Sequence, residues 1–276
     1  METMTRRVIA ALHQARYGGR MDTVGTLLRT WRGHRRLSQL ELAGIAEVSQ
    51  RHLSCVETGR SKPSRDLIRH LSRVLEVPPR HRNELLNAAG FASEYHETPL
   101  DDEAMTSVRR AVELMLSSHN PLPAVLLNRY WDLLDVNDGA LRLLDRLHVD
   151  SEAIMSGTPN IQELTFGDAG FGGYLANRNQ LAAAFLEHSR QEARLDPADE
   201  RVAGHVEFLE GIVGAGGPID HGTGAVIPVH LRTPDGDLRL FSTLASVATP
   251  GDLTTRDLMV ELFFAADDAT DRWLRS

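Results

Sequence analysis

Five positions between residues 39 and 56 constrain the fold of this chain more than any other feature of its sequence. Gln39, Ala43, Val48, Leu53 and Val56 stand at relative positions 1, 5, 10, 15 and 18. This spacing is typical of a helix-turn-helix, because a small residue lets two helices cross and the later apolar residues pack beneath the second helix. The opposite face of that helix is then free to enter a major groove.

Residues 22–91 surround this pair of helices with signals for three more. Ser38 and Glu41 form a capping box at the start of the first helix of the pair, and Ser49 can cap the second. Apolar side chains three and four residues apart, with helix-ending glycine and proline residues, complete the pattern. We therefore expect a compact all-α domain of five short helices, beginning near residues 24, 39, 50, 65 and 80.

The run SQRHLSCVETGRSKPS at 49–64 closely resembles the Cro/phage-repressor-like (XRE) class of DNA-binding proteins. The resemblance implies a lambda-repressor-like fold and binding of double-stranded operator DNA by a homodimer. One departure is Glu47, which stands at the turn position where the class usually has glycine. A left-handed backbone there costs a non-glycine residue about 1 kcal/mol, so either the turn is less sharp or this cost is carried.

The resemblance also assigns roles to individual residues. Gln50 and Arg51 begin the recognition helix and Cys55 lies one turn further on the same face, so all three are expected to contact bases. Arg32 and Glu57 match an ion pair that ties the first helix to the third and serves the structure. The residues at phosphate-contacting positions, which would make binding sensitive to salt, are Gln39, Arg60, Lys62 and Arg65.

The charge of the chain is divided unevenly along its length. Residues 1–95 hold 16 basic and 9 acidic side chains, a net charge of +7, whereas residues 96–276 carry −15. A basic end joined to an acidic body is consistent with a polyanion-binding domain followed by a domain of another kind.

Residues 104–276 read as an α+β domain, after a polar linker over 92–103. Runs of alternating polarity predict five antiparallel strands, with helices inserted between the second and third, and Asp196-Pro197 is expected to begin the last inserted helix. Residues 1–21 are an extension, either a targeting peptide or sequence upstream of a true start at Met21. The expected strands lie near 124–128, 133–137, 225–233, 237–247 and 258–265.

Alternation along these strands gives the sheet an aliphatic face that must be covered. Helices between 138 and 213 are available to cover it, and the gap between sheet and helices can hold a ligand instead of side chains. The residues expected to line such a pocket are Ile227, Val229, Leu231, Leu240, Ser242, Val260 and Leu262.

Two runs, at 120–144 and 227–274, resemble the ligand-binding domain of MmyB-like transcription regulators, as does the junction at 87–102. The resemblance implies a PAS-like fold, an antiparallel five-stranded sheet with flanking helices. It also implies an apolar effector, fatty-acid-like in that family. Residues 145–220 resemble the family least, and ligand specificity is expected to reside there. The resemblance therefore does not identify the ligand of this protein.

Several classes of protein are excluded or disfavoured. A single cysteine in 276 residues rules out a disulfide framework and a cysteine-rich metal site, and no apolar run is long enough to span a membrane. The sequence contains no recognisable set of catalytic residues, so we expect neither enzymatic activity nor a metal site. We expect a cytoplasmic transcription regulator, and a repressor in preference to an activator. Two alternatives stay open: a ligand-blind DNA-binding protein whose C-terminal domain only dimerises or recruits a partner, and an enzyme fused to a DNA-binding domain.

Base-reading and phosphate-contacting residues should respond differently to substitution. Arg51→Ala is expected to cost about 1–3 kcal/mol on the specific operator and to relax base preference at one position. Lys62→Ala is expected to weaken binding to all sequences similarly and to lower the salt slope by about one. Titrations of specific and random DNA at several salt concentrations measure both effects. Identical behaviour of the two variants would contradict the assignment.

Overall fold

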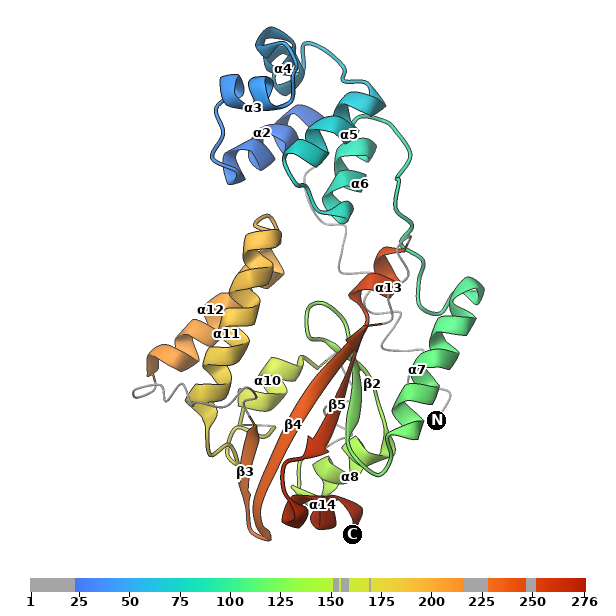
Figure 1. The fold of residues 1–276 in the computed structure, drawn as a ribbon, viewed down its shortest axis with the longest axis vertical. Coiled ribbons are helices and arrows are strands. Elements are labelled where there is room, and N and C mark those ends of the chain that lie inside the picture. Colours follow the sequence, from blue (N-terminus) through green and yellow to red (C-terminus); the bar gives the residue numbers. More distant parts are fainter. Residues whose placement is uncertain (1–22, 151–153, 155–158, 169, 216–227, 247–251) are drawn as a thin grey trace.

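The computed structural model describes residues 23–150, 154, 159–168, 170–215, 228–246 and 252–276, so the extension over 1–21 lies outside the described residues. The N-terminal part is a bundle of five helices, shown at the top of Figure 1. They are α2 (Val24–His34), α3 (Gln39–Ile45), α4 (Gln50–Glu57), α5 (Arg65–Val74) and α6 (Pro79–Ala88). The predicted all-α fold of this part is confirmed.

The α3–α4 pair has the local chemistry that its sequence indicates. Ser38 accepts a hydrogen bond from the Glu41 amide, and the Glu41 carboxylate accepts one from the Ser38 amide, so the capping box forms. Glu47 takes a left-handed conformation, with φ of 52°, immediately after α3. The turn is therefore sharp, and the chain carries the cost of a side chain at this position.

Helix α2 lies unusually close to the end of α4. Gly25 makes this possible, because a Cβ atom there would lie 2.6 Å from the carbonyl oxygens of Val56 and Glu57. Buried apolar side chains from all five helices fill the space behind the pair, including Leu28, Leu42, Leu53, Ile68 and Leu85.

The second part is built on one five-stranded antiparallel sheet with strand order β2-β1-β5-β4-β3. The strands are β1 (Ala124–Leu127), β2 (Leu133–Val136), β3 (Val229–Thr233), β4 (Gly236–Ser246) and β5 (Met259–Ala265). The helices are η1 (Glu103–Met105), α7 (Thr106–Ser118), α8 (Asp138–Arg146), α10 (Ile161–Phe166), α11 (Arg178–Leu195), α12 (Glu200–Ala215), α13 (Leu253–Asp257) and α14 (Asp268–Arg275). The predicted α+β class and the insertion of helices between the second and third strands are confirmed.

Helices cover both faces of the sheet (Figure 1). On one face α7 packs through Val112 and Leu116 against β1 and β5. On the other face α8, α10 and α11 enclose a larger apolar cluster. Helices α11 and α12 pack against each other as an antiparallel hairpin, whose connecting end points toward the helical bundle.

The segment over 92–103 is held by both parts of the molecule. The Asn83 side chain on α6 accepts hydrogen bonds from the Glu94 and Tyr95 amides and donates one to the Tyr95 carbonyl. Further along, the Thr98 amide and hydroxyl both donate to the carboxylate of Asp252, which caps α13. This connection is therefore fixed along its length.

The start of α12 differs from the prediction. Helix α12 begins at Glu200, and its free amides are met by Asp199, whose carboxylate accepts hydrogen bonds from the amides of Arg201 and Val202. Asp196 does not cap this helix, because its carboxylate is used elsewhere, as described below.

Replacing Glu47 by glycine should stabilise the helical domain. Glycine adopts a φ near 52° without the Cβ clash, so we expect Glu47→Gly to raise the free energy of unfolding by about 0.5–1 kcal/mol. Glu47→Ala, which removes the carboxylate but keeps a Cβ atom, is the matched control and should give no gain. Urea unfolding followed by circular dichroism measures both, and a destabilised glycine variant would contradict the strain assigned to this turn.

Candidate functional site

The outer surface of α4 is available to a partner. Gln50 and Arg51 are exposed at its first turn and Cys55 is half-buried one turn later, while Leu53 and Val56 point into the helical core. Ser49 caps the helix by accepting a hydrogen bond from the His52 amide. The structure thus places the three predicted base-contacting residues on one helix whose other face is buried.

A buried carboxylate holds this helix against α2 and α3. The Glu57 side chain has no exposed surface, and Arg32 donates to both of its oxygens at 2.8 and 2.9 Å. Gln39 Nε2 donates to Glu57 Oε2 at 2.8 Å, and Arg29 donates to the Glu57 carbonyl. Burial raises the pKa of Glu57, but the bonds from Arg32 and Gln39 outweigh it, so the pKa stays below its usual range.

The other predicted phosphate contacts lie beside α4. Arg60 and Lys62 are exposed in the loop between α4 and α5. Arg65 is half-buried at the start of α5 and donates to the Ala92 carbonyl at 3.4 Å. Gln39, the fourth predicted phosphate contact, differs from these three because its side-chain amide already donates a hydrogen bond to the buried carboxylate of Glu57.

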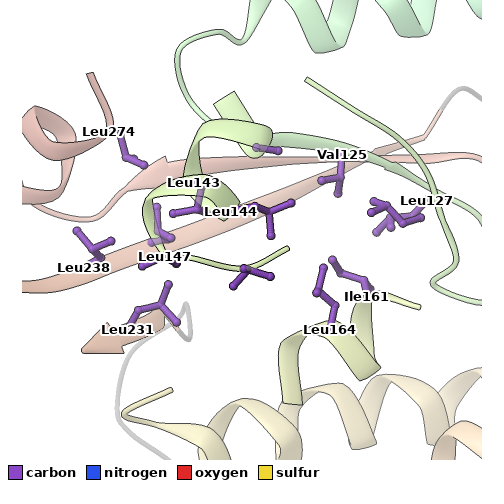
Figure 2. Close-up of a cluster of buried hydrophobic side chains, with 14 of the residues drawn as sticks. Val125, Leu127, Leu143, Leu144, Leu147, Ile161, Leu164, Leu231, Leu238 and Leu274 are labelled. Atoms are coloured by element: carbon purple, nitrogen blue, oxygen red, sulfur yellow. The ribbon is translucent and has the colours of Figure 1, made fainter. Parts of the chain in front are cut away.

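A cavity of about 110 Å³ lies between the sheet and the helices α8, α10 and α11. All but three of its lining residues are apolar. Figure 2 shows leucine and isoleucine side chains from β-strands, α8 and α10 pointing toward one another in the cluster around it. Four of the residues expected from the sequence line this cavity: Val229, Leu231, Leu240 and Ser242.

Two other expected pocket residues lie elsewhere. Val260 and Leu262 point to the opposite face of the sheet, where they pack with Leu116 of α7. In the register of the sheet, Ser242 lies opposite Phe263, so the odd-numbered residues of β5 face the cavity. The assignment of Val260 and Leu262 to the pocket is wrong because both faces of β5 are apolar and covered. Ile227 lies outside the described residues.

The polar lining residues are Thr165, Ser242 and Glu261. Glu261 is 6% exposed and stands on the central strand, between Val125 of β1 and Leu244 of β4. Burial raises the pKa of its carboxyl, and a hydrogen bond with Ser242 only partly opposes this effect. Sequence reasoning missed Glu261, although an acidic residue within the run LMVELFFA is a visible irregularity.

The two domains meet at the carboxylate of Asp196, which follows α11 and is 3% exposed. His81 of α6 contacts Asp196 Oδ1 through Nε2 at 2.8 Å, and Arg129 donates to Oδ2 at 3.1 Å. The other ring nitrogen of His81 lies 2.7 Å from a carboxylate oxygen of Glu84. Both ring nitrogens must then be donors, so the ring is an imidazolium.

A second set of contacts surrounds this one. Arg80, next to His81 on α6, forms ion pairs at 2.6 Å with both Glu97 and Asp257. Ala198, in the turn between α11 and α12, packs against the core of the helical domain. The sequence carries no local signal for the contact of Arg80 with Asp257 or of His81 with Asp196, because the partners in each pair are more than 100 residues apart.

One helix takes part in both the cavity and the domain contact. Leu181 and Phe185 of α11 line the cavity, and α11 ends at Leu195, directly before Asp196. At ~1.5 Å per residue, Phe185 and Leu195 are about 15 Å apart along the helix axis. The cavity wall and the contact with the helical domain are therefore joined by one continuous helix.

Within the described ranges, no group of three or more His, Cys, Asp or Glu side chains is arranged to hold a metal ion. The helices of that same part of the chain include none that is long and apolar enough to cross a bilayer.

The contact at His81 should make stability depend on pH. Burial lowers the pKa of His81, but the hydrogen bonds and charges of the Asp196 and Glu84 carboxylates outweigh burial and raise it to about 9. Because the pKa in the folded protein lies above the ordinary value of 6.5, the added stability is fully present below pH 6.5 and disappears as the pH rises through about 9.

Urea unfolding between pH 6 and 10 tests this dependence, with His81→Gln as the variant that lacks it. We expect the free energy of unfolding of the wild type to fall toward that of the variant above pH 9. An imidazole NMR titration that gave His81 a pKa near 6.5 would contradict the assignment.

Comparisons with known proteins agree with this description. The family model described as "MmyB-like transcription regulator ligand binding domain" matches residues 108–276, and one described as "Helix-turn-helix domain" matches residues 23–85. No curated protein matches the chain.

Among solved structures, one titled "Structure of an RNA-binding Light-Oxygen-Voltage Receptor" is 12% identical, with a TM-score of 0.29 over 100% of this chain. The chain spans 65% of the length of that protein, and a likeness this weak carries no argument. The first family model covers more than half of the chain and follows a helix-turn-helix domain. The protein therefore belongs to the MmyB-like transcription regulators.

Proposed function

We propose that this protein is a cytoplasmic, homodimeric repressor whose affinity for operator DNA is set by a small apolar ligand in the cavity beside α11. It acts by binding alone, without catalysis. The observation that carries the proposal is the double role of α11, which lines the cavity through Leu181 and Phe185 and reaches the DNA-binding domain at Asp196.

The DNA-binding half of the proposal rests on the surface of α4. The exposed side chains of Gln50 and Arg51 can reach base edges, and the amide and guanidinium groups match the paired acceptor and donor atoms of adenine and guanine. Cys55 adds a small half-buried group on the same helix. The flanking cations Arg60 and Lys62 would fix the position of the domain on the phosphates. Two copies would place recognition helices about 34–36 Å apart, one turn of DNA.

The ligand half rests on the chemistry of the cavity. An almost wholly apolar lining favours an aliphatic ligand of the kind expected from the resemblance, since its burial removes apolar surface from water. Such a ligand changes operator affinity only if it binds one arrangement of the domains better than another. A coupling of 1–3 kcal/mol, typical of such systems, corresponds to about 5–150-fold in affinity.

The ion pairs between the domains give this coupling a physical path. The Asp196 carboxylate contacts both His81 of the helical bundle and Arg129 of the sheet domain, so a shift of the end of α11 changes both contacts together. A buried charge is costly when its partner is removed, so partly separated domains are unfavourable. The domains would therefore be either docked, with these ion pairs formed, or separated, with the charges in water.

Native mass spectrometry of the protein purified without added ligand is the first test, with extraction of any bound compound. A dimer that carries a lipid-sized mass supports the proposal. A dimer with no bound mass and no response to added ligands would favour the ligand-blind alternative. A monomer would contradict binding to a two-fold operator.

The route through Asp196 is tested with the extracted compound added back to the ligand-free protein. We expect it to change the operator affinity of the wild type at least fivefold. Asp196→Asn should keep the affinity for the compound but reduce this change to less than twofold, because the contact with His81 is weakened. Glu200→Gln, a nearby exposed carboxylate, is the matched control and should respond like the wild type. An equal response in Asp196→Asn would exclude this route.

A further inference from the structure

The cavity described above contains one group that an apolar ligand does not explain. Glu261 places a carboxyl on the cavity wall, on the central strand of the sheet, where its neighbours across the strands are Val125 and Leu244. A leucine would fill the same position without the cost of burying a polar group. Departures of this kind from the local pattern are expected at functional sites.

The surroundings of Glu261 define what the cavity can recognise. Ser242, diagonal to it on β4, is its hydrogen-bond partner, and Thr165 is the remaining polar lining residue. The described residues that line the cavity include no arginine, lysine or histidine. Nothing in this lining can neutralise a carboxylate, and burial raises the pKa of Glu261, so that its carboxyl favours the neutral form, which has an O–H to donate.

On the basis of the proposed function, we infer that the ligand of this cavity is an aliphatic molecule with an uncharged hydrogen-bond acceptor, such as the carbonyl of a ketone, ester or lactone, which the Glu261 carboxyl binds. The aliphatic chain of the expected fatty-acid-like ligand is kept, but its carboxylate head group is replaced by an uncharged acceptor. A free carboxylate would lie beside a second carboxyl without a cation, and an amine would require an ion pair within an apolar cavity.

Three probes with the same six-carbon chain separate these head groups: methyl hexanoate, hexanoate and hexylamine. Isothermal titration calorimetry with the full chain at pH 7.5 measures each affinity. We expect methyl hexanoate to bind at least tenfold more tightly than either charged probe. Glu261→Leu should lose at least fivefold in affinity for the ester, because the donor is gone. Glu261→Gln, which keeps a donor of similar shape, should recover most of that loss.

Circular dichroism and operator binding confirm that each variant is folded before its affinities are compared. Tighter binding of hexanoate or hexylamine would overturn this inference and leave the ligand-controlled regulator intact. Equal affinities of wild type and Glu261→Leu for the ester would show that Glu261 does not bind the head group, which also overturns the inference. Failure of all three probes to bind would overturn both the inference and the assignment of this cavity as the ligand site.

Discussion

The carboxylate of Asp196 is the interaction on which the arrangement of this protein depends. It is buried between a protonated histidine of the DNA-binding domain and an arginine of the sheet domain, and it directly follows the helix that borders the cavity. Each charge in this set is stable in its buried position only while the others stay in place. The two domains are therefore held in one defined arrangement by a small number of charged groups. Helix α11 connects these charged groups to the wall of the cavity.

Most of the fold could be predicted from the sequence because its signals are local. The spacing of Ala43, Val48 and Leu53 defines a pair of helices whose contacts lie within 20 residues, and the capping box at Ser38 marks where the first begins. The strands are equally visible through alternation. The alternation of polar and apolar residues does not show which helices cover each face of the sheet. Both faces of β5 are apolar, so Val260 and Leu262 were assigned to the cavity although they pack beneath α7.

Asp196 and Glu261, on which the two proposals rest, are missed by sequence reasoning because their contacts join distant segments. Asp196 stands before a proline, which is a strong local signal for a helix start, yet the buried pairing with His81 outweighs that preference and Asp199 takes over the cap. Glu261 is visible as an acid in an apolar strand, but only the register with β1 and β4 shows that it faces the cavity. The position of Gln50, Arg51 and Cys55 on one helix could be predicted because they belong to a short, contiguous pattern, and their contact with bases stays a prediction.

The hydrogen bonds along residues 92–103 have a consequence for how such regulators can be recombined. Because Asn83 holds Glu94 and Tyr95 while Asp252 holds Thr98, the segment is a fitted part of both domains and not an interchangeable tether. A chimera that joins this DNA-binding domain to another sensor would have to carry the matching surface of α13 with it. Insertions or deletions here would shift the domains relative to each other, so the length of this segment is expected to vary far less among relatives than its polar composition suggests.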